Sequence, residues 1–432
     1  MSLDNIGEVV KAGLCTGCGT CAGVCPTSAI GMQVSNGLFL PQIDLTKCTS
    51  CGLCLECCSG RSVDFEKLNL WLFGKKPEDE LLGNYLQCYV GHSSDNSIRF
   101  GSSSGGIATQ LLILALEKGI IDGAIVARMR KDHPLETEAF IARTSEEIIS
   151  ASKSKYCPVA PNEAFRYVLK EKGKFAIVGL PCHIHGIRKA EEKVSSLRDK
   201  MVLHIGLMCS HTVSFCGTEF LLGKLGVSSD QVAEISYRGQ GWPGRLHVKL
   251  RNGSSRSIPY VGKWRSYWPI FSCSFFTPFR CFMCPDETNE LADISLGDAW
   301  LAEFKRERIG ESIIVTRTKS GQDIADLACR SKLVSLISVT GRKVRQSQKE
   351  PLKFKKEDLS NRLMMIQSTR AKIPEFNLVL KSRHSILTSS RNLFLFLNQR
   401  VSERETFRRL LIGIPYPVFR LYSGIYRLLC VF

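Results

Sequence analysis

The chain has 432 residues, of which 44% are apolar, and it carries a formal net charge of +17. This length allows two or three domains with buried cores, and no run of about eighteen uncharged apolar residues occurs, so we expect no membrane-spanning helix. Residues 341–432 hold 19 of the 58 basic side chains and only 6 of the 41 acidic ones. The charge is therefore concentrated at the C-terminal end, and without a nucleic-acid-binding motif we expect no nucleic-acid partner.

The N-terminal part contains two runs of closely spaced cysteines. Disulfides would suit a small secreted domain, but residues 1–14 contain no apolar run of signal-peptide length. Zinc ligands usually form separated pairs, often with histidine, and no histidine lies between Cys15 and Cys58. The spacing C-x2-C-x2-C-x3-C-P is that of bacterial ferredoxins, and it occurs in full from Cys15 to Pro26. The second run keeps this spacing but has Ser59 in place of the proline.

These runs predict two [4Fe–4S] clusters, because in two-cluster ferredoxins the fourth cysteine of each run binds the other cluster. The predicted ligands of the first cluster are Cys15, Cys18, Cys21 and Cys58. Those of the second are Cys48, Cys51, Cys54 and Cys25. Cys57 is interpreted as a spare thiol. A chain with 19 cysteines and ferredoxin motifs is expected in the reducing cytoplasm.

The distribution of apolar, turn-forming and basic residues divides the chain into four parts. We expect a ferredoxin domain in residues 1–60, a connector with a first strand in 61–98, a body in 99–340 and a basic, partly amphipathic helical tail in 341–432. The predicted fold class is α+β, a small bacterial-ferredoxin-like domain followed by an α/β body and a basic helical C-terminal tail. Within the body the expected strands and helices alternate, with ligand sites at the carboxyl ends of the strands. The segments are a helix ending at Gly119, a strand in "IDGAIVARM", helices in "TSEEIISASKS" and "PNEAFRYVLKEKG", a strand and helix in "KFAIVGLPCHIHGIRKA", a strand in "MVLHIGLMCSH", a hairpin at Asn252-Gly253 and strands in "DISLGDAW" and "ESIIVTRT".

A glycine–serine loop precedes the first helix of the body. Ser104, Gly105 and Gly106 would let backbone N–H groups approach a pyrophosphate at the helix N-terminus, but a serine-rich loop that merely starts a helix fits equally well. Lys155 and Tyr156 follow a later helix, where a lysine could stabilise a reduced flavin or could simply belong to an exposed basic loop. Asp298 ends a strand, either as a hydrogen-bond acceptor for a flavin or as part of a turn. No catalytic residue can be assigned.

Four further cysteines indicate a third metal site. Cys182 and Cys209 each follow a predicted strand, and Cys281 and Cys284 form a C-x2-C pair. Four thiolates are the ligand set of another [4Fe–4S] cluster, while a structural zinc and buried apolar cysteines remain as alternatives. Cys216 follows Cys209 closely enough to leave the choice between them open.

Several long motifs in this order carry a family resemblance. "SGGIATQLLILALEKGIIDGAIV", "SKY", "VGLPCHIHGIRK", "IGLMCS" and "CFMCPDETNELADISLGDAW" resemble the beta subunits of coenzyme F420-reducing hydrogenases and dehydrogenases over roughly residues 85–310. The resemblance implies an FAD-binding body that holds its own cluster at Cys182, Cys209, Cys281 and Cys284, with FAD near the glycine–serine and Ser154–Tyr156 loops.

The implied function is electron transfer between [4Fe–4S] clusters and, through FAD, a two-electron hydride acceptor or donor such as coenzyme F420. A non-catalytic electron-relay subunit and a reductase of another metabolite remain as alternatives. The expected partner is an electron carrier such as ferredoxin, or another oxidoreductase subunit. The amphipathic end of the tail predicts either docking on protein or peripheral membrane contact, which leaves the location cytoplasmic or membrane-associated.

Overall fold

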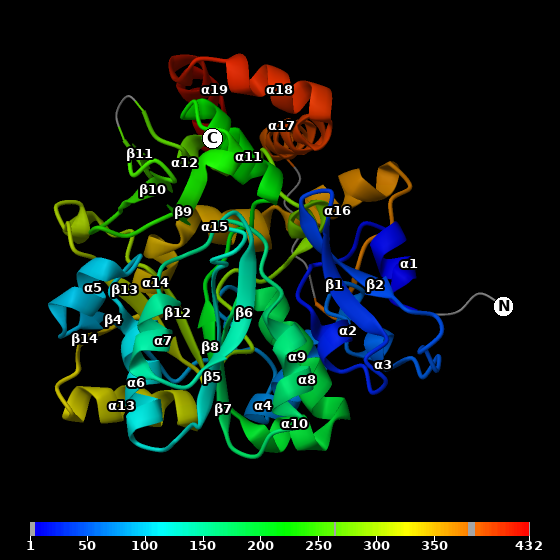
Figure 1. The fold of residues 1–432 in the computed structure, drawn as a ribbon, viewed down its shortest axis with the longest axis vertical. Helices are drawn as coiled ribbons and strands as arrows, with labels where there is room; N and C mark the ends of the chain where they lie inside the picture. The colour runs from blue at the N-terminus through cyan, green and yellow to red at the C-terminus, as the bar shows by residue number, and fades with distance from the viewer. Residues whose placement is uncertain (1–4, 263–264, 379–384, 432) are drawn as a thin grey trace.

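The computed structural model describes residues 5–262, 265–378 and 385–431, and for 427–431 only the backbone. An eight-stranded mixed sheet forms its centre, with strand order β14-β4-β13-β12-β8-β7-β5-β6 (Figure 1). The four strands β12, β8, β7 and β5 are parallel, and antiparallel strands complete both edges. The bounds are β4 Gln87–Ser93, β5 Gly123–Met129, β6 Thr137–Ala142, β7 Phe175–Gly179, β8 Met201–Leu207, β12 Ile294–Asp298, β13 Ser312–Thr316 and β14 Val334–Val339.

Helices formed by apolar segments cover both faces of this sheet. On one face Leu111 and Ile324 pack against Ile205, and on the other Ile184 and Phe165 pack against Ile177. The helices around the first face are α5 Asn96–Gly101, α6 Ile107–Glu117, α7 Ser145–Ser150 and α13 Lys319–Arg330. Those on the second are α4 Phe65–Phe73, α8 Phe165–Val168, α9 Pro181–Lys193 and α10 Ser195–Lys200. The sheet is therefore buried on both faces, as mainly parallel sheets generally are.

The parallel strands place three predicted site residues at one edge. β7 pairs with β8 through Val178 and Ile205, and β8 pairs with β12 through Ile205 and Ile294. Cys182, Cys209 and Asp298 thus come at the carboxyl ends of three adjacent strands. This is the edge at which open α/β sheets bind ligands.

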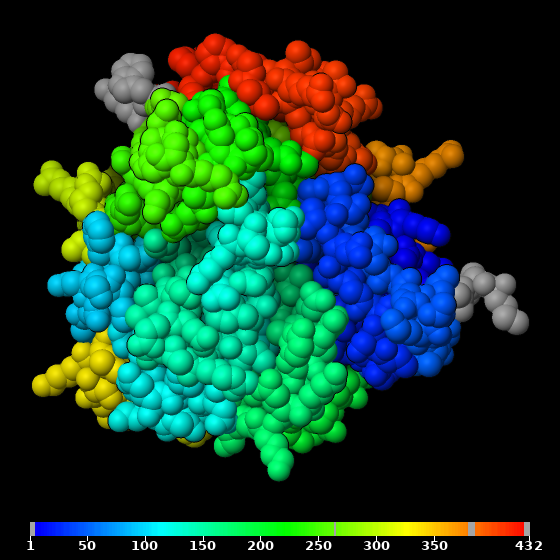
Figure 2. All heavy atoms as spheres, in the orientation of Figure 1, coloured from blue at the N-terminus to red at the C-terminus, as the bar shows by residue number. Residues whose placement is uncertain are grey.

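The cysteine-rich N-terminus forms a small module beside the body, drawn in blue at the right of Figure 1 and in direct contact with the body in Figure 2. Asn162 fixes the two parts together, since its backbone N–H donates to the Cys18 carbonyl at 3.1 Å and its side chain donates to Thr20 at 2.8 Å. The module comprises α1 Gly7–Lys11, α2 Thr20–Gly23, β1 Ile30–Ser35, β2 Leu38–Ile43 and α3 Leu53–Glu56, and β3 Ser62–Val63 follows it.

A second, three-stranded antiparallel sheet and several helices surround another apolar core. Tyr237, Leu246 and Phe271 are among its buried residues. The elements here are α11 Phe215–Lys224, β9 Val232–Ser236, β10 Arg245–Leu250, β11 Ser255–Pro259 and α12 Trp268–Ser272. The C-terminal part adds α14 Gly341–Ser347, α15 Lys349–Leu352, a π-helical turn Lys353–Glu357, α16 Leu359–Ser368, β15 Glu375–Phe376, α17 Ile386–Glu403, α18 Glu405–Gly413 and α19 Tyr416–Val431.

Most of the elements expected in the body are present, with one difference. The segment "PNEAFRYVLKEKG" is not one long helix but a 3-10 turn, Pro161–Ala164, followed by the single turn of α8. Asn162 is committed to the ferredoxin module, and Lys200 Nζ binds the carbonyls of Val168 and Leu169 at the end of α8, each at 2.9 Å. Tertiary hydrogen bonds therefore replace the longer helix that local propensity favours.

Candidate functional site: cysteine sites and the body loops

The cysteines of the two N-terminal runs influence one another's pKa values. Burial, followed by the neighbouring Cys18, Cys15 and Cys58, holds the pKa of Cys21 well above its usual value. Burial is also the main cause of the raised pKa of Cys54, to which Cys51 and Cys25 contribute. Cys58 thus lies near Cys21, and Cys25 near Cys54, while the ligand set of each cluster stays a prediction. Cys57 is fully buried in the apolar core that includes Phe65 and Ile177.

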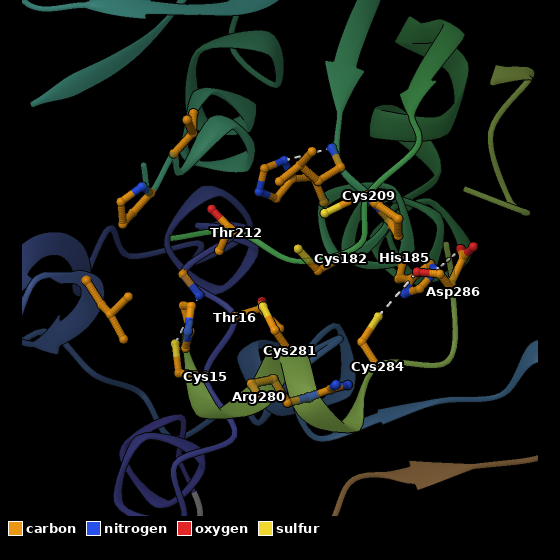
Figure 3. A pocket seen from close by; sticks show the side chains of 18 of the residues that line it. Cys15, Thr16, Cys182, His185, Cys209, Thr212, Arg280, Cys281, Cys284 and Asp286 are labelled. Carbon is orange, nitrogen blue, oxygen red and sulfur yellow. Dashed lines mark hydrogen bonds and ion pairs between the residues drawn. The ribbon is translucent and has the colours of Figure 1, made fainter. Parts of the chain in front are cut away.

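The four body cysteines line one cavity. Cys182 begins α9, Cys209 follows β8, and Cys281 and Cys284 lie in and after the 3-10 helix Phe279–Met283. Figure 3 shows these cysteines around one cavity that Cys15 of the ferredoxin module also lines, with the Cys284 Sγ donating to the Asp286 carbonyl at 3.6 Å. The pKa of Cys182 is held well above its usual value by burial and by Cys18, Cys209, Cys281 and Cys284 in turn. Cys216 lies elsewhere, on α11, where its Sγ contacts Arg408.

The wall of this cavity contains charged groups that no motif identified. Lys355 lines it from the π-helical turn, and its side chain is only 2% exposed. Burial acts to lower the pKa of Lys355, but Cys284, Cys281 and Cys209 outweigh this effect and the pKa lies above its usual value. His185 Nε2 lies 2.7 Å from Asp286 Oδ2 behind the cysteines.

Ser59 joins the ferredoxin module to this cavity. Its hydroxyl donates to the backbone carbonyl of Cys182 at 2.9 Å and lies 3.8 Å from the Sγ of Cys18. Arg280 approaches the same loop and donates to the carbonyls of Gly60 and Ser59 at 3.1 and 3.2 Å. A proline at position 59 has no hydroxyl, so the departure from the ferredoxin pattern creates a contact between two of the predicted cluster sites.

In the described residues no group of three or more His, Cys, Asp or Glu side chains is compact enough to hold a metal ion. That result covers the ferredoxin runs as well as the four body cysteines.

The glycine–serine loop is packed tightly between strands. The Gly105 N–H donates to Ser312 Oγ at 2.9 Å, and Ser104 Oγ donates to the Glu311 carbonyl at 2.7 Å. A Cβ at Gly105 would lie 2.5 Å from the Gly91 carbonyl oxygen, so close packing against β4 already requires this glycine. Gly106 caps α6 in the left-handed region, with φ of 77°. The hydroxyl of Ser102 in the same loop is buried without a hydrogen-bond partner among the described residues.

Three loops meet at this point. The Ser154 N–H donates to Ser103 Oγ at 2.7 Å, and the Gly241 N–H donates to the Phe100 carbonyl at 3.1 Å. Lys155 lies between them, where its Nζ donates to the carbonyls of Ser152 and Lys153, both at 2.9 Å, and to that of Ala151. Burial lowers the pKa of Lys155 to about 7, while these acceptors favour its protonated form.

Tyr156 and Asp298 are brought together through Arg238. Both carboxylate oxygens of Asp298 accept from Arg238, at 2.8 and 3.0 Å, and Oδ1 also accepts from Trp242 at 2.7 Å. Arg238 also donates to the Tyr156 hydroxyl at 3.2 Å and lies 4.6 Å from the ring centroid of Tyr260. Asp298 is therefore not a simple turn residue: it holds a buried guanidinium in place.

Stacked rings connect the two regions. His211, two residues after Cys209, stacks on Trp268 with 5.9 Å between centroids, and Trp268 lies 4.8 Å from Tyr260. Tyr260 in turn stacks on Tyr156 at 5.7 Å. The cysteine cavity and the loops around Tyr156 are thus adjoining parts of one carboxyl edge.

Comparison with known proteins agrees with this arrangement. Residues 88–165 and 172–341 match the N-terminal and C-terminal parts of the family described as "Coenzyme F420 hydrogenase/dehydrogenase, beta subunit". The chain belongs to this beta subunit family. Residues 14–60 match the 4Fe-4S dicluster domain, which establishes the N-terminal module as an iron–sulfur domain. The expected family and the ferredoxin-like region are therefore confirmed.

Several members of the beta subunit family are similar over most of their length. The coenzyme F420 hydrogenase subunit beta of Methanosarcina barkeri is 29% identical, over 55% of this chain and 80% of its own. That of Methanothermobacter thermautotrophicus is 30% identical, over 56% of this chain and 81% of its own. A coenzyme F420-dependent sulfite reductase of Methanocaldococcus jannaschii is 27% identical over 82% of this chain but 51% of its own. A chain of the F420-reducing [NiFe] hydrogenase complex of Methanosarcina barkeri superposes with a TM-score of 0.52, at 25% identity, over 67% of this chain and 94% of the other.

Three residues of the candidate site could not be identified from the sequence. Arg238 lies in "YRGQGWPGR", where the density of glycines was the available signal. Ser59 was noted only as a missing proline. Lys355 lies beyond the residues that match the family, and nothing in "PLKFKKED" distinguishes it from its lysine neighbours.

Proposed function

We propose that this protein is an iron–sulfur flavoprotein subunit that moves electrons between [4Fe–4S] clusters and, through FAD, a hydride acceptor or donor such as coenzyme F420. The observation that supports this most strongly is the cavity of Cys182, Cys209, Cys281 and Cys284. It adjoins Cys15 and Cys18 of the dicluster module on one side and the stacked rings near Tyr156 on the other. Clusters carry single electrons, hydride carriers take two, and FAD handles both, so FAD supplies the conversion between them when bound.

The chain's own groups suit a third cluster at this cavity. Four thiols converge there, and a buried lysine and a buried arginine provide positive charge beside them. Thiolate ligands with nearby cations and backbone hydrogen bonds are the means by which proteins hold iron–sulfur clusters and adjust them. The residues that would bind this cluster are therefore the four body cysteines, and Ser59 and Arg280 keep the dicluster module against them.

The three loops at the carboxyl edge fit a dinucleotide. Ser102 offers an unsatisfied hydroxyl, and Ser104, Gly105 and Gly106 lead into the N-terminus of α6. Lys155 can hold a proton on Nζ near neutral pH. Arg238, fixed by Asp298, presents a permanent positive charge beside Tyr156. These residues would hold FAD, position it and exclude water from it.

The relatives support coenzyme F420 as the acceptor or donor, since the named hydrogenase subunits and the sulfite reductase all act with it. They also support work inside a larger complex, with another oxidoreductase subunit or a ferredoxin as partner. The sulfite reductase, in which the matched part belongs to a longer protein, favours a second candidate: delivery of electrons to a metabolite other than F420.

Anaerobic iron, sulfide and flavin analysis of the full chain tests the proposal. We expect about twelve iron atoms per chain, four for each cluster, and one FAD. Cys182→Ser and Cys284→Ser should each remove the same EPR signal, whereas Cys329→Ser, on α13, should remove none. About eight iron atoms, or unchanged spectra in both variants, would rule out the third cluster.

The flavin part has its own test. Ser102→Ala removes a hydroxyl that bonds to nothing in the described residues, so it should lower FAD content without disturbing the fold. Gly105 is unsuitable for this purpose because any side chain there collides with Gly91. Purified protein that holds three clusters but no flavin, and does not reduce F420 with a low-potential donor, would favour a pure electron-relay subunit.

A further inference from the structure

The segment that follows the family-matched residues returns to the cysteine cavity. The match ends at residue 341, and α15, the π-helical turn and α16 come after it. Phe282 of the 3-10 helix that carries Cys281 packs against Leu359 and Leu363 of α16. Arg362 also donates to the Phe282 carbonyl at 2.6 Å. These contacts fix the π-helical turn over the C-x2-C pair and direct Lys355 into the cavity.

Lys355 is a buried ammonium whose neighbours are sulfur atoms. Its Nζ lies 3.5 Å from the Cys281 carbonyl oxygen, and its strongest favourable electrostatic partners are Cys284, Cys281 and Cys209. Among the described residues it forms no ion pair with a carboxylate. Two nearby carboxylates are used by other cations: Lys356 binds Glu290, and Arg391 binds Asp358. A third, Glu287, lies near Lys355 but forms no ion pair with it in the described residues.

A buried charge without a counter-ion is strongly destabilising, so its retention indicates an anionic partner. Four cysteine thiolates around an iron–sulfur cluster carry net negative charge, which becomes more negative by one unit when the cluster is reduced. A fixed positive charge in a medium of low polarity therefore favours the reduced state. The group that Lys355 faces is the one whose charge changes in electron transfer.

We propose that Lys355 sets the reduction potential of the cluster bound by Cys182, Cys209, Cys281 and Cys284, and raises it above the value the ligands alone would give. This inference rests on the third cluster of the proposed function. Lys355 is not a ligand; it acts on the cluster through its charge. Lys355 lies outside the family-matched residues, on the segment that packs over the C-x2-C pair.

Two other groups near the cavity could act on the same potential. Arg280 also lines the cavity, but its guanidinium is bound to the carbonyls of Ser59 and Gly60 in the dicluster module. Glu287 lies near both Cys209 and Lys355, and its Oε2 has no hydrogen-bond partner in the described part of the chain. Glu287→Gln should therefore be compared with the Lys355 variants.

The experiment is a redox titration followed by EPR, on full-length protein purified anaerobically. Lys355→Met and Lys355→Gln remove the charge, and Lys355→Arg keeps it. Lys349→Met, an exposed lysine on α15, is the control. In both neutral variants we expect the reduction equilibrium of one signal to shift at least tenfold toward the oxidised form, about 59 mV lower. The other two signals, and all three in Lys349→Met and Lys355→Arg, should stay near their wild-type potentials.

Three results would overturn the inference in distinguishable ways. Three signals in every protein, with the same potentials in wild type and both neutral variants, would leave the proposed function intact and reject the role of Lys355. A larger shift in Glu287→Gln than in Lys355→Met would assign the potential to Glu287 instead. Only two signals and about eight iron atoms in the wild type would remove the third cluster itself, and the inference with it.

Discussion

His204 is buried at the opposite side of the parallel strands from the cysteines, between two carboxylates. Its Nδ1 lies 2.8 Å from Asp293 Oδ2 and its Nε2 lies 2.6 Å from Glu191 Oε1, and Arg188 bridges both acids at 3.0 Å. Burial and Arg188 oppose protonation, but Glu191 and Asp293 outweigh them, so the pKa of His204 lies above its usual value. The network thus favours the protonated form of His204 in the core.

Because the folded-state pKa is raised, this group stabilises the fold fully below pH about 6.5 and loses its contribution as the pH rises through the folded pKa. His204→Gln should cost roughly 3 kcal/mol at pH about 6, and progressively less at higher pH. Thermal unfolding of both proteins from pH about 6 to pH about 9 measures the difference. His133→Gln, at an exposed position, should leave the pH profile unchanged. A constant wild-type advantage across this range would show that His204 is neutral.

At the scale of elements, the β1–β2 hairpin docks the dicluster module on α11. Its tip, Gly37, accepts from the Phe215 N–H at 2.8 Å. A Cβ on Gly37 would lie 2.7 Å from the Cys216 Sγ, and the φ of 72° disfavours any other residue. Glycine is therefore required at position 37 both by the turn of the hairpin and by its close contact with α11.

Gly37→Ala should destabilise the protein by roughly 1–3 kcal/mol through backbone strain and the contact with Cys216. Hydrogen exchange at the Phe215 amide should accelerate, because its acceptor moves away. Gly31→Ala in the same hairpin meets nothing within 4 Å and should change stability by less than about 0.5 kcal/mol. Equal effects of the two substitutions would mean that the hairpin tip contributes nothing to docking.

Helices and strands could be predicted where their own residues show a clear hydrophobic pattern. The strand ends before Cys182 and Cys209 could be found because buried parallel strands are short apolar runs, and these ends bring both cysteines to the cavity that Cys281 and Cys284 also line. The edge strands β6 and β14 were missed, since Thr137–Ala142 and Val334–Val339 are partly exposed and mix apolar with polar residues. Lys355 and Arg238 could not be predicted, because their roles depend on long-range packing that leaves no spacing in the sequence.

At the scale of the whole molecule, the C-terminal helices have two faces. Leu411 and Phe419 are buried in the core around α11, where the Phe419 ring lies 5.8 Å from that of Phe220. Leu410 and Leu421 point outward and are 62% and 76% exposed. The expected docking on the body is therefore present, and a second apolar surface remains on α18 and α19. In the described residues no helix is long and apolar enough to cross a membrane.

Peripheral membrane contact stays a prediction for that outer surface. Full-length protein should float with anionic liposomes at low salt, and the double variant Leu410→Gln/Leu421→Gln should float less, because burying apolar side chains drives such binding. Leu45→Gln, an equally exposed leucine of the dicluster module, should have no effect. If the wild-type protein does not float, the membrane hypothesis is wrong and a partner subunit is the expected occupant of this surface.

The loop Cys58–Ser62 is held from several sides. Besides the contacts of Ser59 and Arg280, Lys189 Nζ on α9 donates to the carbonyls of Cys58 and Ser62 at 2.8 and 2.7 Å. A tethered carrier domain delivers electrons by repeated diffusion and encounter, so its turnover slows in viscous solvent. Here the dicluster module is fixed to the wall of the cysteine cavity, and under the proposed function electrons would cross a static gap whose width is set by folding. Internal transfer should then be insensitive to viscosity, and only exchange with an outside partner would require an encounter.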